Sequence, residues 1–158
     1  MVIYTIGYGN KTLKEVLAQI QLETKTENII IDVRAINSAG YSGDFEMMML
    51  KITLGDLGIG YHWMGDKLGS KNLNPPRYKD AEIEDKIKEK EAKFVEGCHE
   101  LVTWMKNYPN SSIVLLCALF NPYRCHRHTV IETKFKELYP EIEFKHILWN
   151  KEDNGLFN

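Results

Sequence analysis

Two cysteines and a histidine stand close together in the last third of the chain, at Cys117, Cys125 and His126. A cysteine thiolate is a nucleophile, and an imidazole moves protons near neutral pH. The apolar residues 113–118 are typical of a buried strand, and the segment after Cys125 is typical of a helix. This arrangement predicts a cysteine-dependent site, with Cys117 or Cys125 as the reactive thiol and His126 as a proton shuttle.

Arginine is rare in the chain, at four residues against sixteen lysines, yet three of the four are predicted at strand ends. Open parallel sheets bind ligands there, and arginine binds anions through two parallel hydrogen bonds. Arg34, Arg124 and Arg127 could therefore form an anion clamp, or could simply pair with Asp32, Asp66 or loop carbonyls. Asp32 and Arg34 alternate on one strand, so we expect them to share a face, to form an ion pair and to place Arg34 toward the cysteine loop.

A second candidate binding segment lies at the end of the first predicted strand. Its glycines could let the backbone approach an anion at the start of the next helix, although a tight turn is the simpler interpretation. The segment lacks the third glycine of the dinucleotide fingerprint. Aromatic residues near strand ends could line a pocket for a planar ligand or pack in the core. The binding candidates here are Gly7, Tyr8, Gly9, Asn10 and Asp32, and the aromatic residues are Tyr8, Tyr41, Tyr61, Trp63 and Tyr123.

Familiar cysteine and metal templates differ from this pattern. Phosphatase-type loops place five residues between cysteine and arginine, whereas six separate Cys117 from Arg124, and no Cys-x-x-Cys is present. A metal site needs three or four convergent ligands, for which Cys117, Cys125, His126 and His128 are the nearest candidates. Because His126 and His128 are two apart in a helix, we expect them to point to different faces. The sequence thus predicts no metal site and no cofactor.

The positioning of these residues depends on an alternation of strands and helices along the chain. Thr12 and Glu15 form a capping box, and Phe45, Met48, Met49 and Ile52 follow the spacing of a helix that buries one face. The charge-rich residues 80–93 are interpreted as a solvated helical face. The predicted strands are 2–6, 29–34, 59–64, 113–118 and 143–148, and the predicted helices are 12–22, 45–58, 94–105 and 126–138, with loops at 35–44 and 65–78.

This order predicts a single three-layer α/β domain over residues 1–150, with a mostly parallel five-stranded sheet and helices on both faces. Residues 151–158 are expected to be a loose tail. The length of 158 residues suits one domain. Neither a membrane span nor a secretory signal is expected, and the odd count of three cysteines fits a reducing cytoplasmic location. The net charge of −2 makes long nucleic acid a poor partner.

The element Cys117-x7-Cys125-His126-Arg127, together with the N-terminal segment Thr5-Ile6-Gly7, resembles a known family pattern. On these motifs the chain resembles the DUF488 family, small bacterial and archaeal proteins without an established activity, over nearly its whole length to about Trp149. The resemblance implies an α/β domain with a cysteine-centred site, and no particular substrate. Family members commonly have an acidic residue two positions after the first motif cysteine, where this chain has Leu119. They carry arginine and proline in the loop where this chain has residues 37–41. The matching segments are Thr5-Ile6-Gly7-Tyr8-Gly9-Asn10, Asp32-Val33-Arg34, Gly58-Ile59-Gly60-Tyr61, Leu68-Gly69, Leu116-Cys117-Ala118 and Cys125-His126-Arg127.

Three hypotheses about function follow from these patterns. The first is a cysteine-dependent enzyme that acts on a small anionic or nucleotide-like ligand. The second is a binding module without covalent chemistry that holds a phosphate-bearing ligand or a nucleic-acid end through the same arginines. The third is a metal or redox-responsive protein. We rank them in this order, and the oligomeric state stays open.

Overall fold

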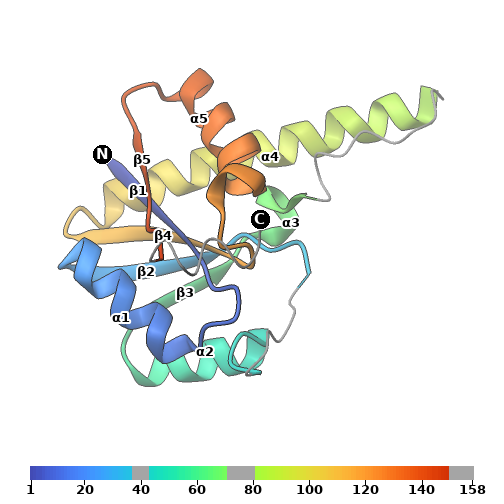
Figure 1. Cartoon of the computed structure of the whole chain (residues 1–158). Helices are drawn as coiled ribbons and strands as arrows, with labels where there is room; N and C mark the ends of the chain where they lie inside the picture. The colour runs from blue at the N-terminus through green and yellow to red at the C-terminus, as the bar shows by residue number, and fades with distance from the viewer. Residues whose placement is uncertain (37–42, 71–80, 150–158) are drawn as a thin grey trace.

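The protein is built on one sheet of five parallel strands in the order β3-β2-β4-β1-β5 (Figure 1). The computed structural model describes residues 1–36, 43–70 and 81–149, and of residues 81–84 the backbone only. The strands are β1 (Val2–Gly7), β2 (Glu27–Asp32), β3 (Gly60–Trp63), β4 (Ser111–Cys117) and β5 (Glu143–His146), and the helices are α1 (Leu13–Thr24), α2 (Met47–Asp56), α3 (Gly65–Leu68), α4 (Ala81–Asn107) and α5 (Thr133–Leu138).

Helices cover both faces of this sheet, with α1 and α2 on one side and α4 and α5 on the other (Figure 1). Successive strand residues supply the two cores in turn. Ile29 and Ile31 pack in the cluster that contains Phe94 of α4, whereas Ile30 packs in the cluster that contains Leu13 of α1. A strand buried on both faces is apolar at consecutive positions, which is the pattern that the sequence displays. The predicted three-layer α/β domain is confirmed.

The two central strands of the site are β4 and its neighbour β1. Cys117 ends β4 on the face covered by α4, and Leu116 belongs to the core on the opposite face. The register places Gly7 beside Cys117 and Asp32 beside Leu116. The carboxyl ends of β1, β2 and β4 therefore meet at one edge, as the sequence predicted.

The helix α1 begins at the predicted capping box. The hydroxyl of Thr12 accepts a hydrogen bond from the backbone N–H of Glu15, and the Glu15 carboxylate accepts one from the backbone N–H of Thr12. The helix α4 also follows its pattern, since residues 85–93 are almost all exposed whereas Phe94 and Cys98 are buried. The charged start of α4 is thus a solvated extension of a buried helix.

The predicted buried face of α2 is wrong. Leu50 and Leu54 are buried in α2, whereas Met48, Met49 and Ile52 are about half exposed. The helix begins after Phe45, which is a buried core residue outside the helix. The apolar spacing counted from Phe45 therefore does not describe the helix. Apolar residues on both sides of α2 made the choice of face ambiguous.

Two local elements also differ from the prediction. The segment expected to be one regular helix from His126 onward begins as a π-helix, Arg127–Glu132, and becomes α-helical only in α5. The segment expected to be a loop from Gly65 forms the short helix α3, which packs against α4. A Cβ at Gly65 would lie 1.8 Å from the carbonyl oxygen of Arg34, so close backbone packing holds this turn.

Several predictions concern residues outside the described part of the chain: most of the loop at 35–44 with Tyr41, the later part of the loop at 65–78, residue 150 as the domain boundary and the tail at 151–158. Across residues 1–36, 43–70 and 81–149, no helix has both the length and the apolar character that a bilayer crossing requires.

Gly7 and Gly55 give a matched test of this packing. A Cβ at Gly7 would lie 1.7 Å from the carbonyl oxygen of Leu119, whereas a Cβ at Gly55, on the exposed side of α2, would meet no atom within 4 Å. We expect Gly7→Ala to lower the free energy of unfolding by at least about 3 kcal/mol. We expect Gly55→Ala to raise it by about 0.5–1 kcal/mol, because alanine favours the helix. Urea denaturation of both variants measures this, and equal effects would contradict the close approach at Gly7.

Candidate functional site

Cys117, Cys125 and His126 meet where β4 ends. A short 3-10 turn, Pro122–Arg124, brings the chain back so that the sulfur atoms of Cys117 and Cys125 lie 3.3 Å apart. The Nδ1 atom of His126 lies 3.8 Å from the sulfur of Cys117 and 3.7 Å from that of Cys125. The structure thus brings together the three residues that the sequence singled out for chemistry.

The orientation of the His126 ring follows from its second nitrogen. Its Nε2 atom lies 3.0 Å from the carbonyl oxygen of Val33. A carbonyl oxygen only accepts, so Nε2 carries the hydrogen, and in the neutral ring Nδ1 is the unprotonated nitrogen. This nitrogen faces both sulfurs, which suits a group that takes a proton from one thiol and passes it on.

Electrostatics distinguish the two thiols. The hydrogen bond from the Cys125 thiol, with smaller contributions from the charge of Arg127 and from backbone N–H groups, lowers the pKa of Cys117 to about 6 against the effect of burial. The same contact, together with burial, raises the pKa of Cys125 to about 12. The pair therefore holds one thiolate, at Cys117, with Cys125 as its thiol donor. The sequence left the reactive cysteine open, and the surroundings favour Cys117.

Arg127 lies behind this pair and has no exposed surface. Its two terminal nitrogens donate to the carbonyl oxygens of Leu119, at 2.6 Å, and Phe120, at 2.9 Å. Its Nε atom has no hydrogen-bond partner among the described residues. The side chain therefore fixes the loop after Cys117 and contributes charge, which agrees with the alternative in which the arginines pair with loop carbonyls.

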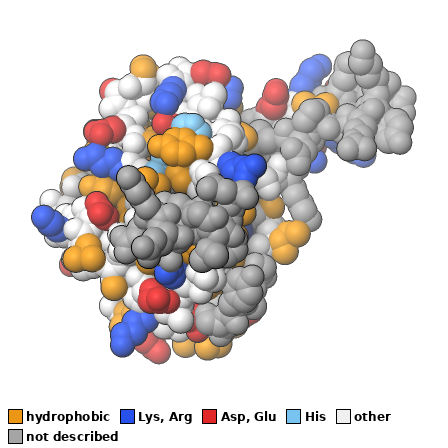
Figure 2. Space-filling model, in the orientation of Figure 1, with side chains coloured by type: hydrophobic (Ala, Val, Ile, Leu, Met, Phe, Trp, Pro, Cys, Tyr) orange, Lys and Arg blue, Asp and Glu red, His pale blue; other side chains and the backbone are white. Residues whose placement is uncertain are grey.

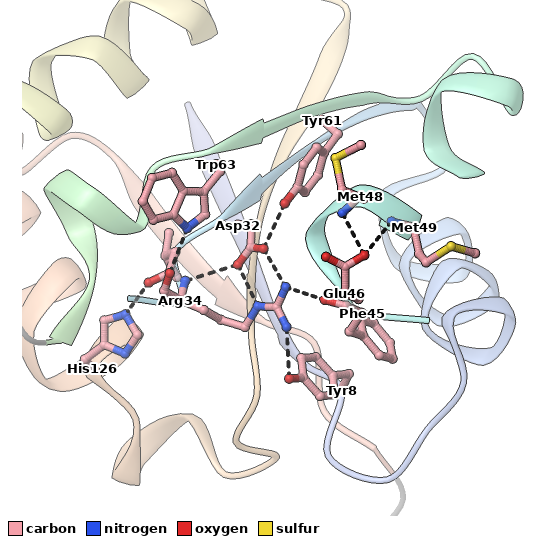
Figure 3. A network of polar contacts seen from close by, with 11 residues as sticks. Tyr8, Asp32, Arg34, Phe45, Glu46, Met48, Met49, Tyr61, Trp63 and His126 are labelled. Carbon is pink, nitrogen blue, oxygen red and sulfur yellow. Dashed lines mark hydrogen bonds and ion pairs between the residues drawn. The ribbon is translucent and has the colours of Figure 1, made fainter. Parts of the chain in front are cut away.

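Arg34 forms the predicted ion pair with Asp32 on β2, shown in Figure 3. The pair is bidentate, with Arg34 Nε 2.8 Å from Oδ1 and a terminal nitrogen 2.6 Å from Oδ2 of the fully buried Asp32. Arg34 also donates to the hydroxyl of Tyr8 and the carbonyl of Phe45, and Tyr61 donates to Asp32. Burial opposes the charge of Arg34, yet the hydrogen bonds and charge of Asp32 raise its pKa above the ordinary value. The guanidinium is thus held by the buried ion pair, which agrees with the alternative in which it pairs with Asp32, and Arg34 also lines the pocket beside the cysteines.

The remaining binding candidates lie around this network. The backbone N–H groups of Tyr8 and Gly9 donate to the carbonyls of residues 117–118, which extends the pairing of β1 with β4. Gly7 accepts from the indole of Trp149 and is closed in by the loop after β4. Asn10 and Arg124 are exposed. This segment is therefore the tight turn of the simpler interpretation.

A pocket of about 240 Å³ opens directly onto the thiols. Cys117, Cys125 and His126 line it, although the two cysteines are only 6% and 1% exposed. The other lining residues are Arg34, Ala35, Ile36, Ser70, Ala118 and Leu119. A larger hollow of about 650 Å³ runs along α4, where the lining includes His99 and charged residues but neither cysteine of the pair. The smaller pocket is the one that joins a nucleophile to a place for a ligand. The lining residues of the smaller pocket include none of the candidate aromatic residues Tyr8, Tyr61, Trp63 and Tyr123.

Two groups of side chains among the described residues could hold a metal ion. One is the site itself, Cys117, Cys125 and His126, and the other consists of His128, Glu132 and His146. As predicted, His126 and His128 join different clusters. The sequence offered one signal for the second group, the i, i+4 spacing of His128 and Glu132, but the contribution of His146 depends on the position of β5 beside β1.

The fold and the site define a class: an α/β domain whose central strand delivers a thiol pair and an imidazole to a small pocket. A family model described as "Domain of unknown function DUF488" matches residues 12–133, and the chain belongs to that family. Among curated proteins and among solved structures, none matches this chain.

The pH dependence of alkylation tests the assignment of the thiolate. We expect the rate of reaction with iodoacetamide to rise with pH and to reach half its plateau at about pH 6, because Cys117 is then half ionised. Cys98 contributes little, since burial raises its pKa to about 12. Cys125→Ala removes the donor and should move the midpoint toward the ordinary value of about 8.5, whereas Cys125→Ser keeps a donor and should move it less. A wild-type midpoint near the ordinary value would contradict the assignment.

The structural role of Arg127 is tested against an exposed arginine of the same segment. Arg127→Met removes the buried arginine donor from the carbonyl oxygens of Leu119 and Phe120, so we expect the free energy of unfolding to fall by about 2–5 kcal/mol. Arg124→Met should change it by less than about 0.5 kcal/mol, because Arg124 is exposed. Urea denaturation at pH 7 compares the two, and similar values for both variants would count against this role.

Proposed function

We propose that the protein is a cysteine-dependent enzyme in which Cys117 is the nucleophile and the substrate is a small anionic or nucleotide-like molecule. The observation that carries this proposal is the contact of the Cys117 sulfur with the Cys125 thiol inside a pocket that His126 also lines. A thiolate held by a neighbouring thiol at neutral pH is the reactive form of cysteine. Nothing in a purely structural role requires such a thiolate at a pocket wall.

The simplest chemistry for this arrangement is group transfer in two steps. The Cys117 sulfur attacks the electrophilic atom of the substrate, a bond from sulfur to the transferred group forms, and the bond to the leaving group breaks. A basic leaving group takes the proton of the Cys125 thiol, either directly or relayed by Nδ1 of His126, which lies 3.7 Å from the Cys125 sulfur. Water then cleaves the bond to sulfur, its hydroxyl joins the transferred group, and its remaining proton restores the donor.

The preference for an anionic substrate rests on the charges and dipoles around the pocket. The backbone N–H groups of Ala118 and Leu119 stabilise negative charge at Cys117, and the buried guanidinium of Arg127 adds a positive charge behind them. Together they favour negative charge at the carboxyl end of β4. A substrate with a phosphate, sulfate or carboxylate group fits this environment.

The competing function is a binding module that holds a phosphate-bearing ligand or a nucleic-acid end without covalent chemistry. Such a module needs donors that face solvent, yet Arg34 and Arg127 are buried and engaged inside the protein. Arg124 is exposed but does not line the pocket. These contacts favour the enzyme over the binding module.

The proposed setting is the cytoplasm, because the chemistry requires reduced thiols. Cys98, Cys117 and Cys125 are all free, and a reducing compartment keeps neighbouring thiols in that form.

A burst experiment with p-nitrophenyl phosphate, sulfate and acetate tests the proposal. We expect at least one of them to release about one p-nitrophenolate per chain in a burst. Intact-protein mass spectrometry should then show the transferred group on Cys117. Cys117→Ser should abolish the burst, and Cys98→Ser, which removes a buried thiol of α4, should leave it unchanged.

The controls separate the enzyme from the binding module. Equal release by wild type and Cys117→Ser with all three esters would contradict the proposal. Inorganic phosphate that binds wild type and Cys117→Ser equally well, without any burst, would favour the binding module.

A further inference from the structure

A second cluster of titratable side chains lies close to the thiol site and takes no part in it. His128 and Glu132 come from the π-helix Arg127–Glu132, and His146 ends β5. The Oε2 atom of Glu132 lies 2.6 Å from Nδ1 of His128 and 2.9 Å from Nε2 of His146, and the two nitrogens lie 3.3 Å apart. We propose that these three atoms bind one divalent transition-metal ion of the zinc class.

The distances are close to those of a metal site with three protein ligands. Tetrahedral zinc with bonds of about 2.0–2.2 Å places its ligand atoms roughly 3.3 Å apart. The nitrogen atoms of His128 and His146 already have this separation. The nitrogen–oxygen distances from Glu132 to His128 and His146, 2.6 Å and 2.9 Å, need to open by roughly 0.7 Å and 0.4 Å, which small rotations of the carboxylate and of the partly exposed His128 imidazole provide.

The groups around the cluster hold each ligand in the required orientation. The second nitrogen of His146, Nδ1, lies 2.7 Å from the hydroxyl of the fully buried Thr5. Lys136 binds the other carboxylate oxygen of Glu132 at 2.8 Å, which leaves Oε2 toward the histidines. The ring of Tyr123 packs edge-on against both imidazoles. Hydrogen bonds of the kind that Thr5 makes to the far side of His146 are typical of metal-binding histidines.

The chemistry of the donors selects the class of metal. Magnesium and calcium prefer several oxygen ligands, and this cluster has one carboxylate, with Lys136 beside it. Two imidazole nitrogens and one carboxylate oxygen suit zinc, ferrous iron, nickel or copper. The side chain of His128 is about one-third exposed, at 32%, so an ion and a fourth ligand such as water can reach the cluster. Figure 2 shows histidine surface beside hydrophobic side chains on the face that it draws.

A plain hydrogen-bond network is the alternative, because Oε2 of Glu132 could accept an N–H from each histidine without any metal. The thiol cluster is a second alternative, since Cys117, Cys125 and His126 could bind the same ion. A test must therefore measure metal binding and also identify the ligands.

Isothermal titration of Zn²⁺ into the full chain, freed of metal with a chelator, tests the proposal together with variants of both clusters. We expect one Zn²⁺ per chain. His128→Asn and Glu132→Gln should each weaken binding by at least about 100-fold, and Thr5→Val by about 10–100-fold. The double variant Cys117→Ser with Cys125→Ser and the exposed control His99→Asn should bind as wild type does. Zn²⁺ should raise the Tm of wild type but not that of His128→Asn, whose metal-free Tm reports that it is folded.

Cobalt gives an independent readout of the ligands. Co²⁺ bound by the histidine cluster should show ligand-field absorption without a sulfur-to-cobalt charge-transfer band. The absence of one-to-one Zn²⁺ binding to wild type would overturn the proposal and favour the hydrogen-bond network. Binding that survives in His128→Asn and Glu132→Gln but disappears in the double cysteine variant would overturn it in favour of the thiol cluster. Neither result depends on whether Cys117 is a catalytic nucleophile.

Discussion

The buried guanidinium of Arg127 links the shape of the loop after β4 to the ionisation of the thiol pair. It holds the carbonyls of Leu119 and Phe120, and so fixes the loop that carries the chain from Cys117 to Cys125. A buried cation without a partner is costly. None of the ion pairs among the described residues supplies a carboxylate to Arg127, and the anion that its charge stabilises is the Cys117 thiolate. The side chain of Arg127 therefore both holds the loop in place and stabilises the ionised thiol.

The second buried guanidinium, that of Arg34, has a different role. Arg34 and Asp32 neutralise each other with bidentate geometry, and Tyr8 and Tyr61 bind the pair on either side (Figure 3). Such a pair adds no net charge to the nearby pocket. It instead fixes the turn after β2, whose Val33 carbonyl orients the ring of His126. The two arginines that resembled an anion clamp in the sequence thus act through the residues they position.

The sequence was sufficient for the fold and for the meeting of Cys117, Cys125 and His126, because both follow from local rules. Apolar runs and turns define parallel strands, and the carboxyl ends of such strands meet at one edge. The roles of Arg34 and Arg127 could not be read in this way, since an arginine at a strand end can bind a ligand or a carbonyl equally well. The π-helix and the contribution of His146 could not be predicted from the sequence, for another reason. Both depend on contacts between segments that are distant in the chain, and periodicity carries no information about these.

Arg127 also explains why a carboxylate must accompany the histidine pair His128 and His146. Burial lowers the pKa of His146 even though Glu132 raises it, and the positive charge of Arg127 acts in the same direction as burial. A guanidinium that favours an anion at the thiol cluster therefore opposes any cation at the histidine cluster. Glu132 offsets this, and it is nearly buried at 7% exposure with two histidines and Lys136 as partners. The positive charge of Arg127 thus has opposite effects on the two clusters. It stabilises the anionic sulfur of Cys117, whereas a cationic group at His128 or His146 needs the carboxylate of Glu132 beside it.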